Sequence, residues 1–131
     1  MDRVYLASEF TFDAAHKLHN YEGKCKQLHG HTYKLQVTIC GIPDITTGLL
    51  VDFNDLKRLV KTMIVDKLDH RNLTDFFDDC YVSRKIGGMN TTVENICIWI
   101  WNTLYPAHLP QLYEITLWET PTCYATYRGG G

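Results

Sequence analysis

Two histidines and a cysteine lie close together in the stretch CKQLHGHTY, which runs from Cys25 to Tyr33. Imidazole and thiolate groups are common zinc ligands, and a thiolate can also carry a proton in catalysis. Because His29 and His31 are two residues apart, both side chains point to the same face if this segment is a strand. The stretch predicts a metal site, a catalytic thiol or both. The alternative is a pair of hydrogen-bonded core histidines beside an unrelated cysteine.

A third histidine follows the same alternation. The run VYLASEFTFDAAH, from Val4 to His16, predicts a strand with His16 at the end of its apolar row, and HTYKLQVTIC predicts a second strand in phase with His29 and His31. Antiparallel pairing of these strands brings all three imidazoles together. Three neutral imidazoles with an open fourth position are typical of catalytic zinc, so the pattern favours Zn2+ over core histidines.

Cys25 lies four residues before His29, in the loop that leads into the second strand. A nearby zinc ion lowers the pKa of a thiol and favours the thiolate. Cys25 then has two possible roles, as a proton-transferring group or as a fourth ligand that closes a structural site. The residue pattern leaves both open.

Glu119 ends the row formed by every second residue from Tyr113 in YEITLWE. A carboxylate at the end of an apolar row is costly unless it is paired, so we expect a cationic or hydrogen-bonding partner. A bound ligand with N–H donors would use it. The alternative is a strand-end carboxylate that reaches water.

Asp69 and His70 form a carboxylate–imidazole pair suited to acid–base work, although such pairs also occur as surface features at helix ends. Thr91 to Glu94 matches the capping-box pattern, and helix capping is a sufficient explanation for both residues. His19 and His108 have no in-phase partners, so we assign them to the surface.

The remaining pattern predicts the elements that hold these groups. A short strand is expected at LLVD, a helix over residues 53–68, a long loop over 69–90, a helix from about Val93 to Leu104, and a hairpin from YEITLWE and CYATYR. The order is two strands, two helices and two strands.

Composition narrows the possible classes of protein. A chain of 131 residues fits one domain, residues 1–131. The net charge of −2 argues against broad binding to nucleic acid or to an anionic membrane. Five cysteines without a CxxC pair, and an N-terminus that carries charges, favour a reducing, cytoplasmic location.

Several motifs in the same order resemble one known family. They are FTFDAAH, the C-x-x-x-H-G-H of Cys25 to His31, GLLVDFNDLK, LDHRNL, TVEN and LWET. Together they resemble the 6-pyruvoyl-tetrahydropterin synthase superfamily, and especially its bacterial branch, the 6-carboxy-5,6,7,8-tetrahydropterin synthases of queuosine biosynthesis. The three-residue gap between Cys25 and His29 is similar to that branch.

The resemblance implies an α+β tunnelling fold, ββααββ, with an antiparallel four-stranded sheet and two helices on one face. The sheets of several subunits would join into a barrel, as a trimer or hexamer with sites between subunits. In this family His16, His29 and His31 would bind zinc, Cys25, Asp69 and His70 would be catalytic, and Glu119, Thr92 and Glu94 would bind the pterin.

The implied reaction converts 7,8-dihydroneopterin triphosphate into 6-carboxy-5,6,7,8-tetrahydropterin, acetaldehyde and triphosphate. One alternative is elimination of triphosphate alone, which gives 6-pyruvoyl-tetrahydropterin. A second is a non-enzymatic, zinc-stabilised oligomer that binds pterins or purines, with Cys25 as the closing ligand. Lys24, Lys26 and Arg71 are candidate phosphate contacts, although solvated surface charge also explains them. The loop from Phe76 to Asn90, with Arg84 and Lys85, matches no family motif.

Overall fold

The computed structural model describes residues 2–18, 23, 27–81 and 90–130. In this part of the chain a five-stranded sheet has the order β3-β1-β2-β4-β5. The strands are β1 (Val4–His16), β2 (His29–Gly41), β3 (Arg71–Asn72), β4 (Leu112–Thr120) and β5 (Cys123–Tyr127). Neighbouring strands are antiparallel except for the two-residue β3, which is parallel to β1. The α+β class and the ββααββ core are confirmed, and β3 adds a strand to the four that were expected.

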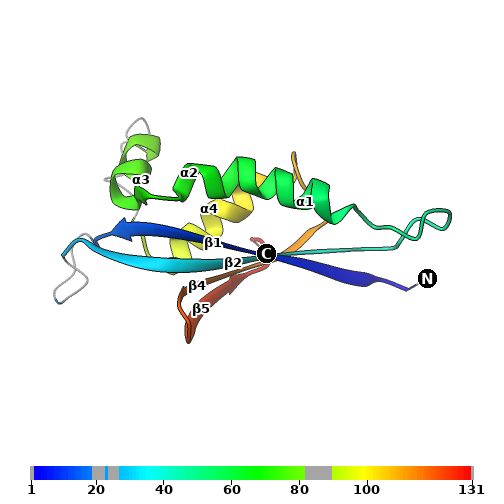
Figure 1. Cartoon of the computed structure of the whole chain (residues 1–131), viewed down its shortest axis with the longest axis horizontal. Coiled ribbons are helices and arrows are strands. Elements are labelled where there is room, and N and C mark those ends of the chain that lie inside the picture. Colours follow the sequence, from blue (N-terminus) through cyan, green and yellow to red (C-terminus); the bar gives the residue numbers. More distant parts are fainter. Residues whose placement is uncertain (1, 19–22, 24–26, 82–89, 131) are drawn as a thin grey trace.

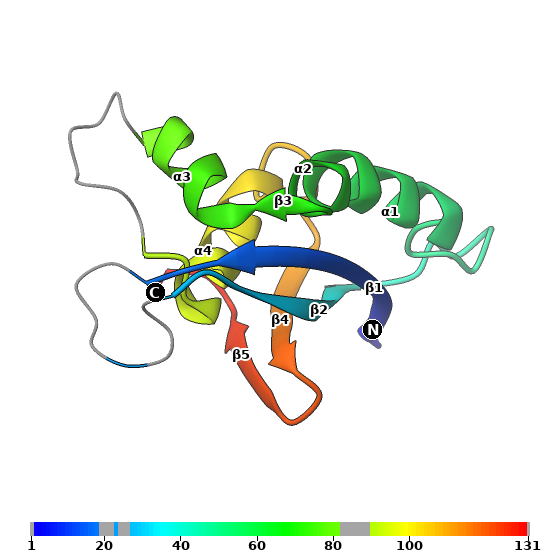
Figure 2. The same cartoon turned by 60° about the vertical axis from the view of Figure 1, so that its left-hand side comes forward.

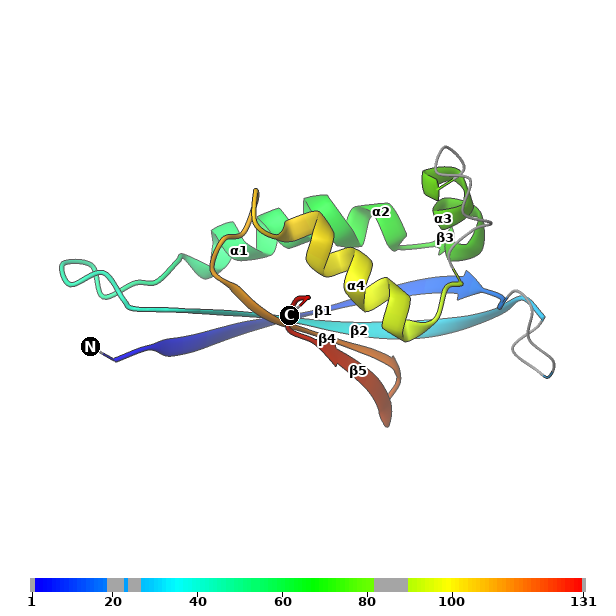
Figure 3. The same cartoon turned by 180° about the vertical axis from the view of Figure 1, so that it is seen from behind.

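The helices lie on one face of this sheet, and the other face carries no helix in the described ranges (Figure 1, Figure 3). They are α1 (Phe53–Val60), the π-helical turn η2 (Lys61–Val65), α2 (Asp66–Leu68), α3 (Leu73–Tyr81) and α4 (Val93–Leu104). The first three run on without a break and so match the helix predicted over 53–68. None of the described helices is long and apolar enough to cross a membrane.

A single core fills the space between the sheet and the helices. Phe12 from β1, Leu35 from β2 and Leu117 from β4 point to the helical side and are almost fully buried. Val60 and Ile100 meet them from the helices and expose no surface. Burial of such side chains is worth about 1.5–3 kcal/mol each, so this layer fixes which face of β1 and β2 points inward.

The long β1–β2 ladder sets the position of the functional residues. It is paired without interruption from Val4 opposite Gly41 to His16 opposite His29. In Figure 2 the two strands run side by side beneath the helices. Because side chains alternate between faces, a ladder without a bulge carries the inward phase of Phe12 through to His16.

Three predictions about strands and loops were wrong. The LLVD segment forms no strand; Leu50 and Val51 instead pack against the edge of the core. The loop expected over 69–90 contains β3 and α3. Its helix begins where Asn72 accepts a hydrogen bond from the Asp75 N–H, and its buried residues Leu73 and Phe77 stand four apart, which is a helical spacing.

The third wrong prediction concerns the start of β4. The ladder places Thr38 opposite Glu114 but Ile39 opposite Leu112, so Tyr113 is an extra residue at a bulge. Leu112 turns into the core, and the Tyr113 ring instead contacts Tyr5 at 4.8 Å between ring centroids. Tyr113 therefore leaves the row that was predicted to end at Glu119, while Ile115 and Leu117 keep their places in it.

Candidate active site

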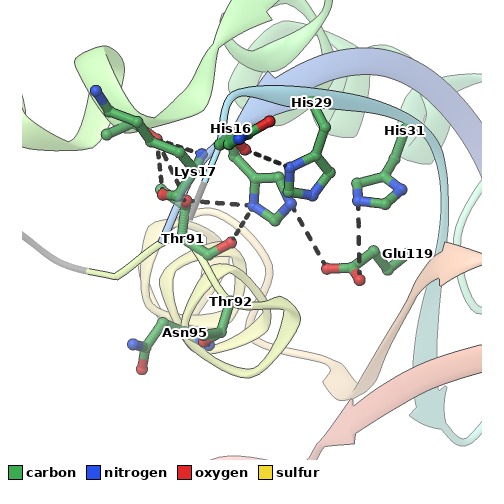
Figure 4. Close-up of polar contacts among 10 residues, drawn as sticks. His16, Lys17, His29, His31, Thr91, Thr92, Asn95 and Glu119 are labelled. Carbon is green, nitrogen blue, oxygen red and sulfur yellow. Dashed lines mark hydrogen bonds and ion pairs between the residues drawn. The ribbon is translucent and has the colours of Figure 1, made fainter. Parts of the chain in front are cut away.

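His16, His29 and His31 meet at one end of the β1–β2 ladder (Figure 4). Their ring centroids are separated by 4.6 Å, 5.1 Å and 4.8 Å for the pairs 16–29, 16–31 and 29–31. One ring nitrogen from each residue lies within 4.8 Å of the others. The strand parity thus brings the three predicted ligands together as expected.

Two of the rings are oriented by backbone carbonyls. The Nδ1 atom of His16 lies 2.6 Å from the Thr91 carbonyl oxygen, and that of His29 lies 2.7 Å from the Gln27 carbonyl oxygen. A carbonyl only accepts hydrogen bonds, so each Nδ1 must be the protonated donor. In a neutral ring this leaves the Nε2 lone pair free, and hydrogen bonds of this kind commonly orient metal-binding histidines.

The Nε2 atoms of His16 and His31 are buried and have no hydrogen-bond partner among the described residues. The Glu119 carboxylate oxygens are 3.9 Å from the first and 3.8 Å from the second, beyond hydrogen-bonding distance. A buried polar atom without a partner costs about 1–3 kcal/mol. A metal ion would satisfy both atoms, and neutral imidazoles suit zinc, so the residues present fit this ion.

The electrostatics of the cluster also suit a cation. Burial lowers the pKa of His16 and of His31, which is the less deeply buried of the two. The negative charge of Glu119 opposes the shift at both residues. These two rings, His16 and His31, therefore stay neutral to a lower pH than an exposed histidine does. Because a metal competes with protons for the same lone pairs, a lowered pKa favours metal binding near neutral pH.

Glu119 lies on β4 with its side chain 29% exposed. It lines a groove of about 490 Å³ together with His31, Lys34 and Trp118. The Tyr33 hydroxyl is buried nearby, without a hydrogen-bond partner in the described ranges, and burial and the Glu119 charge raise the pKa of Tyr33. The carboxylate is thus held between the histidines and an open groove.

Asp69 and His70 form a second cluster with Asp13. The Asp69 carboxylate lies 3.0 Å from His70 Nδ1 and accepts a 3.0 Å hydrogen bond from the Asp13 N–H. The Asp13 carbonyl accepts a 2.6 Å bond from the His70 N–H. The hydrogen bond from the Asp13 N–H lowers the pKa of Asp69, and the neighbouring His70 lowers it by a smaller amount. His70 has a φ of +59°, a left-handed conformation that is uncommon for histidine and that the two Asp13 contacts help to hold.

Two grooves that share His31 as a lining residue border these clusters. A groove of about 560 Å³ is lined by His70, Asp13, Thr32 and His31, among others. His31 also lines the groove of Glu119. The Thr32 hydroxyl donates a 2.6 Å bond to the Asp13 carboxylate, and both residues line the first groove. Asp13 was not singled out from the sequence, although it stands in the FTFDAAH motif.

The remaining predicted site residues that the structure describes do not belong to the histidine cluster or to the Asp13–Asp69–His70 cluster. Thr92 caps α4 by accepting a hydrogen bond from the Asn95 N–H, and Glu94 is exposed in the first turn, lining neither groove. The cap is thus at Thr92 and not at Thr91 as the capping-box pattern predicted. Arg71 lines the His70 groove. Cys25, Lys24, Lys26, His19, Arg84 and Lys85 lie outside the described residues.

Residues 5–130 match the 6-pyruvoyl tetrahydropterin synthase family. The chain therefore belongs to the 6-pyruvoyl tetrahydropterin synthase family, as the resemblance of its motifs implied.

The relatives include proteins named as 6-carboxy-5,6,7,8-tetrahydropterin synthases and proteins named as 6-pyruvoyl tetrahydrobiopterin synthases. The chain is 36% identical to the 6-carboxy-5,6,7,8-tetrahydropterin synthase of Haemophilus influenzae, over 94% of this chain and 97% of that protein. It is 33% identical to the 6-pyruvoyl tetrahydrobiopterin synthase of Dictyostelium discoideum, over 96% of each. The solved structure of Caenorhabditis elegans 6-pyruvoyl tetrahydropterin synthase superposes with a TM-score of 0.86 at 30% identity, covering 99% of this chain and 98% of the other.

Proposed function

We propose that this protein is a zinc-dependent lyase that converts 7,8-dihydroneopterin triphosphate and one water molecule into 6-carboxy-5,6,7,8-tetrahydropterin, acetaldehyde and triphosphate, a step of queuosine biosynthesis. The observation that carries the proposal is the convergence of three imidazoles, two with orphaned Nε2 atoms, beside the grooves of Glu119 and His70. Membership of a pterin synthase family supports the substrate class.

His16, His29 and His31 would hold the zinc ion. Bound there, zinc would act as a Lewis acid toward the oxygens of the substrate side chain. The chain's own contribution is to keep His16 and His31 neutral through burial, and to orient His16 and His29 through the Thr91 and Gln27 carbonyls.

The Asp69–His70 pair would move a proton at the substrate side chain. Asp69 holds His70 through Nδ1, which leaves Nε2 as the atom that exchanges a proton with a substrate hydroxyl. Cys25, as a thiolate, would take a proton from the carbon next to the pterin ring. Positioned acid–base groups of this kind are worth about 10²–10⁴-fold in rate.

Glu119 would bind the pterin ring. Glu119 lines a groove large enough for a small heterocycle, and a carboxylate pairs well with an amide N–H and an amino group side by side. Thr92 and Glu94, at the start of α4, would complete the pocket.

The proposed active unit is a homo-oligomer, a trimer or hexamer with sites between subunits, in which the sheets join into a barrel. Two observations support it: the sheet face opposite the helices is uncovered by any described helix, and the His70 side chain, proposed as catalytic, is 77% exposed. A cytoplasmic location belongs to the same proposal, supported by the free thiols of Cys40, Cys97 and Cys123.

Product analysis tests the reaction. Zinc-replete protein is incubated with 7,8-dihydroneopterin triphosphate, and the products are identified by mass spectrometry beside a chelated control. We expect 6-carboxytetrahydropterin and acetaldehyde only with metal. The second candidate is 6-pyruvoyl-tetrahydropterin synthesis, favoured by the Dictyostelium and Caenorhabditis relatives. A pyruvoyl product would establish that candidate, and no turnover in either sample would contradict both.

A further inference from the structure

Two buried threonines, Thr74 and Thr91, lie near the segment that follows His16. Figure 4 shows Thr91 on the side of the His16 ring away from the other histidines. Thr74, in the first turn of α3, is 1% exposed, and Thr91, just before α4, is fully buried. Their hydroxyl oxygens are 3.5 Å apart. The pair belongs to neither groove, and the proposed chemistry does not use either side chain.

The two hydroxyls fix the backbone that follows His16. Thr74 Oγ1 accepts a 3.0 Å bond from the Lys17 N–H and donates a 3.1 Å bond to the Lys17 carbonyl. Thr91 Oγ1 lies 3.3 Å from that carbonyl and also 3.3 Å from His16 Nδ1. The end of β1, the start of α3 and the segment before α4 therefore meet at one point.

This network also holds the carbonyl that orients His16. The Thr91 hydroxyl anchors its residue to Lys17, and the carbonyl of the same residue accepts the 2.6 Å bond from Nδ1. Capping of α4 does not need the Thr91 hydroxyl, because Thr92 supplies the cap. A carbonyl held at this position keeps the proton on Nδ1 and leaves Nε2 as the lone-pair atom in the histidine cluster.

We propose that the Thr74–Thr91 hydroxyl pair is a positioning device that fixes the orientation and tautomer of His16, and through it the zinc affinity of the site. The inference rests on the proposed zinc site. It adds that two residues which never touch the ion set how tightly it is held.

A matched control exists elsewhere in the sheet. Thr116 is 5% exposed, and its hydroxyl lies 3.4 Å from that of Thr126, so it also belongs to a threonine pair. It contacts no histidine in the described residues. Thr116→Val therefore removes a buried hydroxyl from the same fold without touching the support of His16.

The experiment measures zinc affinity by competition with a chromophoric chelator, for the full-length protein and for Thr91→Val, Thr74→Val, Thr91→Ser and Thr116→Val. We expect Thr91→Val to weaken binding about 10-fold or more and Thr74→Val by less, the usual scale for groups that orient a metal-binding histidine. Thr91→Ser, which keeps the hydroxyl, restores tight binding, and Thr116→Val leaves it unchanged.

A second readout needs no zinc. Nitrogen-15 NMR of the histidine rings in the zinc-free protein reports which nitrogen carries the proton, and we expect His16 to be the Nδ1–H tautomer, which Thr91→Val makes mixed. Wild-type protein that binds no zinc would overturn the proposed site and this inference with it. Zinc bound equally by wild type, Thr91→Val and Thr74→Val, with an unchanged tautomer, would overturn this inference alone and leave the site standing.

Discussion

His16 and His70 are each held by an oxygen partner at Nδ1, yet the His16 side chain is 3% exposed and the His70 side chain 77% exposed. His16 sits at the end of an unbroken ladder, beneath helices, with its tautomer set by a carbonyl. His70 sits in a left-handed turn at the sheet edge beside a carboxylate. The single chain thus completes the histidine cluster but leaves the acid–base pair open to water.

The difference indicates what each cluster requires. A buried, neutral set of lone pairs is ready for a cation without rearrangement. An exposed imidazole works as a tuned acid or base only when a substrate or a second subunit excludes water from it. The contrast therefore agrees with the proposed assembly, in which sites are shared between subunits.

Loss of a buried ligand is the strongest way to break this contrast. We expect His16→Ala to weaken zinc binding by about 100-fold or more, because one of three ligands is gone, and turnover to fall below detection. Zinc content after dialysis and the product assay measure both. His108→Ala, which changes an exposed histidine, serves as the control and should behave as wild type.

Substitution of Cys25 separates the enzyme from a closed, structural zinc site. If Cys25 moves a proton, Cys25→Ala keeps stoichiometric zinc and the wild-type melting temperature but loses about 10²–10⁴-fold in kcat. If Cys25 is a fourth ligand, zinc and thermal stability fall together. Metal analysis and calorimetry on the same sample distinguish the two results.

Replacement of His70 tests the exposed cluster. His70→Asn removes the proposed acid–base group, and we expect kcat to fall about 10²–10³-fold with zinc affinity unchanged. Asn also tolerates the left-handed conformation, so the turn is kept. A variant that loses zinc as well would mean that the two clusters are not independent.

The smallest expected effect is on the pH dependence of the free energy of unfolding. The pKa values of His16 and His31 in the folded chain lie below the ordinary value of 6.5, so the unfolded chain binds protons more readily near that pH. Their contribution to the stability of the zinc-free protein is therefore present above about pH 6.5 and is lost as the pH falls toward the lowered values. Urea unfolding from pH 8 to pH 5 should show this decline. His16→Gln should reduce the decline.

The sequence predicted the features that depend on alternation within long strands. His16, His29 and His31 follow from the parity of β1 and β2, because one buried face of an unbroken ladder allows a single register. Glu119 also lies on its predicted face, near His16 and His31, although the β4–β5 ladder shifts register between Trp118 and Thr120. Tyr113 does not keep its predicted place, because an extra residue at a bulge has no signature in the alternation that it interrupts.

Other features depend on contacts between distant segments and could not be read locally. Asp13 supports Asp69 through its backbone, and Thr91 orients His16 through its carbonyl, so neither role depends on side-chain type alone. Helix α3 has a recognisable sequence signal, because Asn72 is a capping residue and Leu73 and Phe77 follow it at helical spacing. A helix of nine residues is, however, too short for its hydrophobic periodicity to be clear in the sequence.

Turnover measured against bound zinc tests the central claim most directly. Zinc is titrated into the chelated protein, and the rate with 7,8-dihydroneopterin triphosphate is followed as occupancy rises to one ion per chain. The account predicts no turnover at zero occupancy, a rate that rises in proportion to bound zinc, and the loss of both in His16→Ala. A substantial rate without metal, or tight zinc binding that survives in His16→Ala, would contradict it.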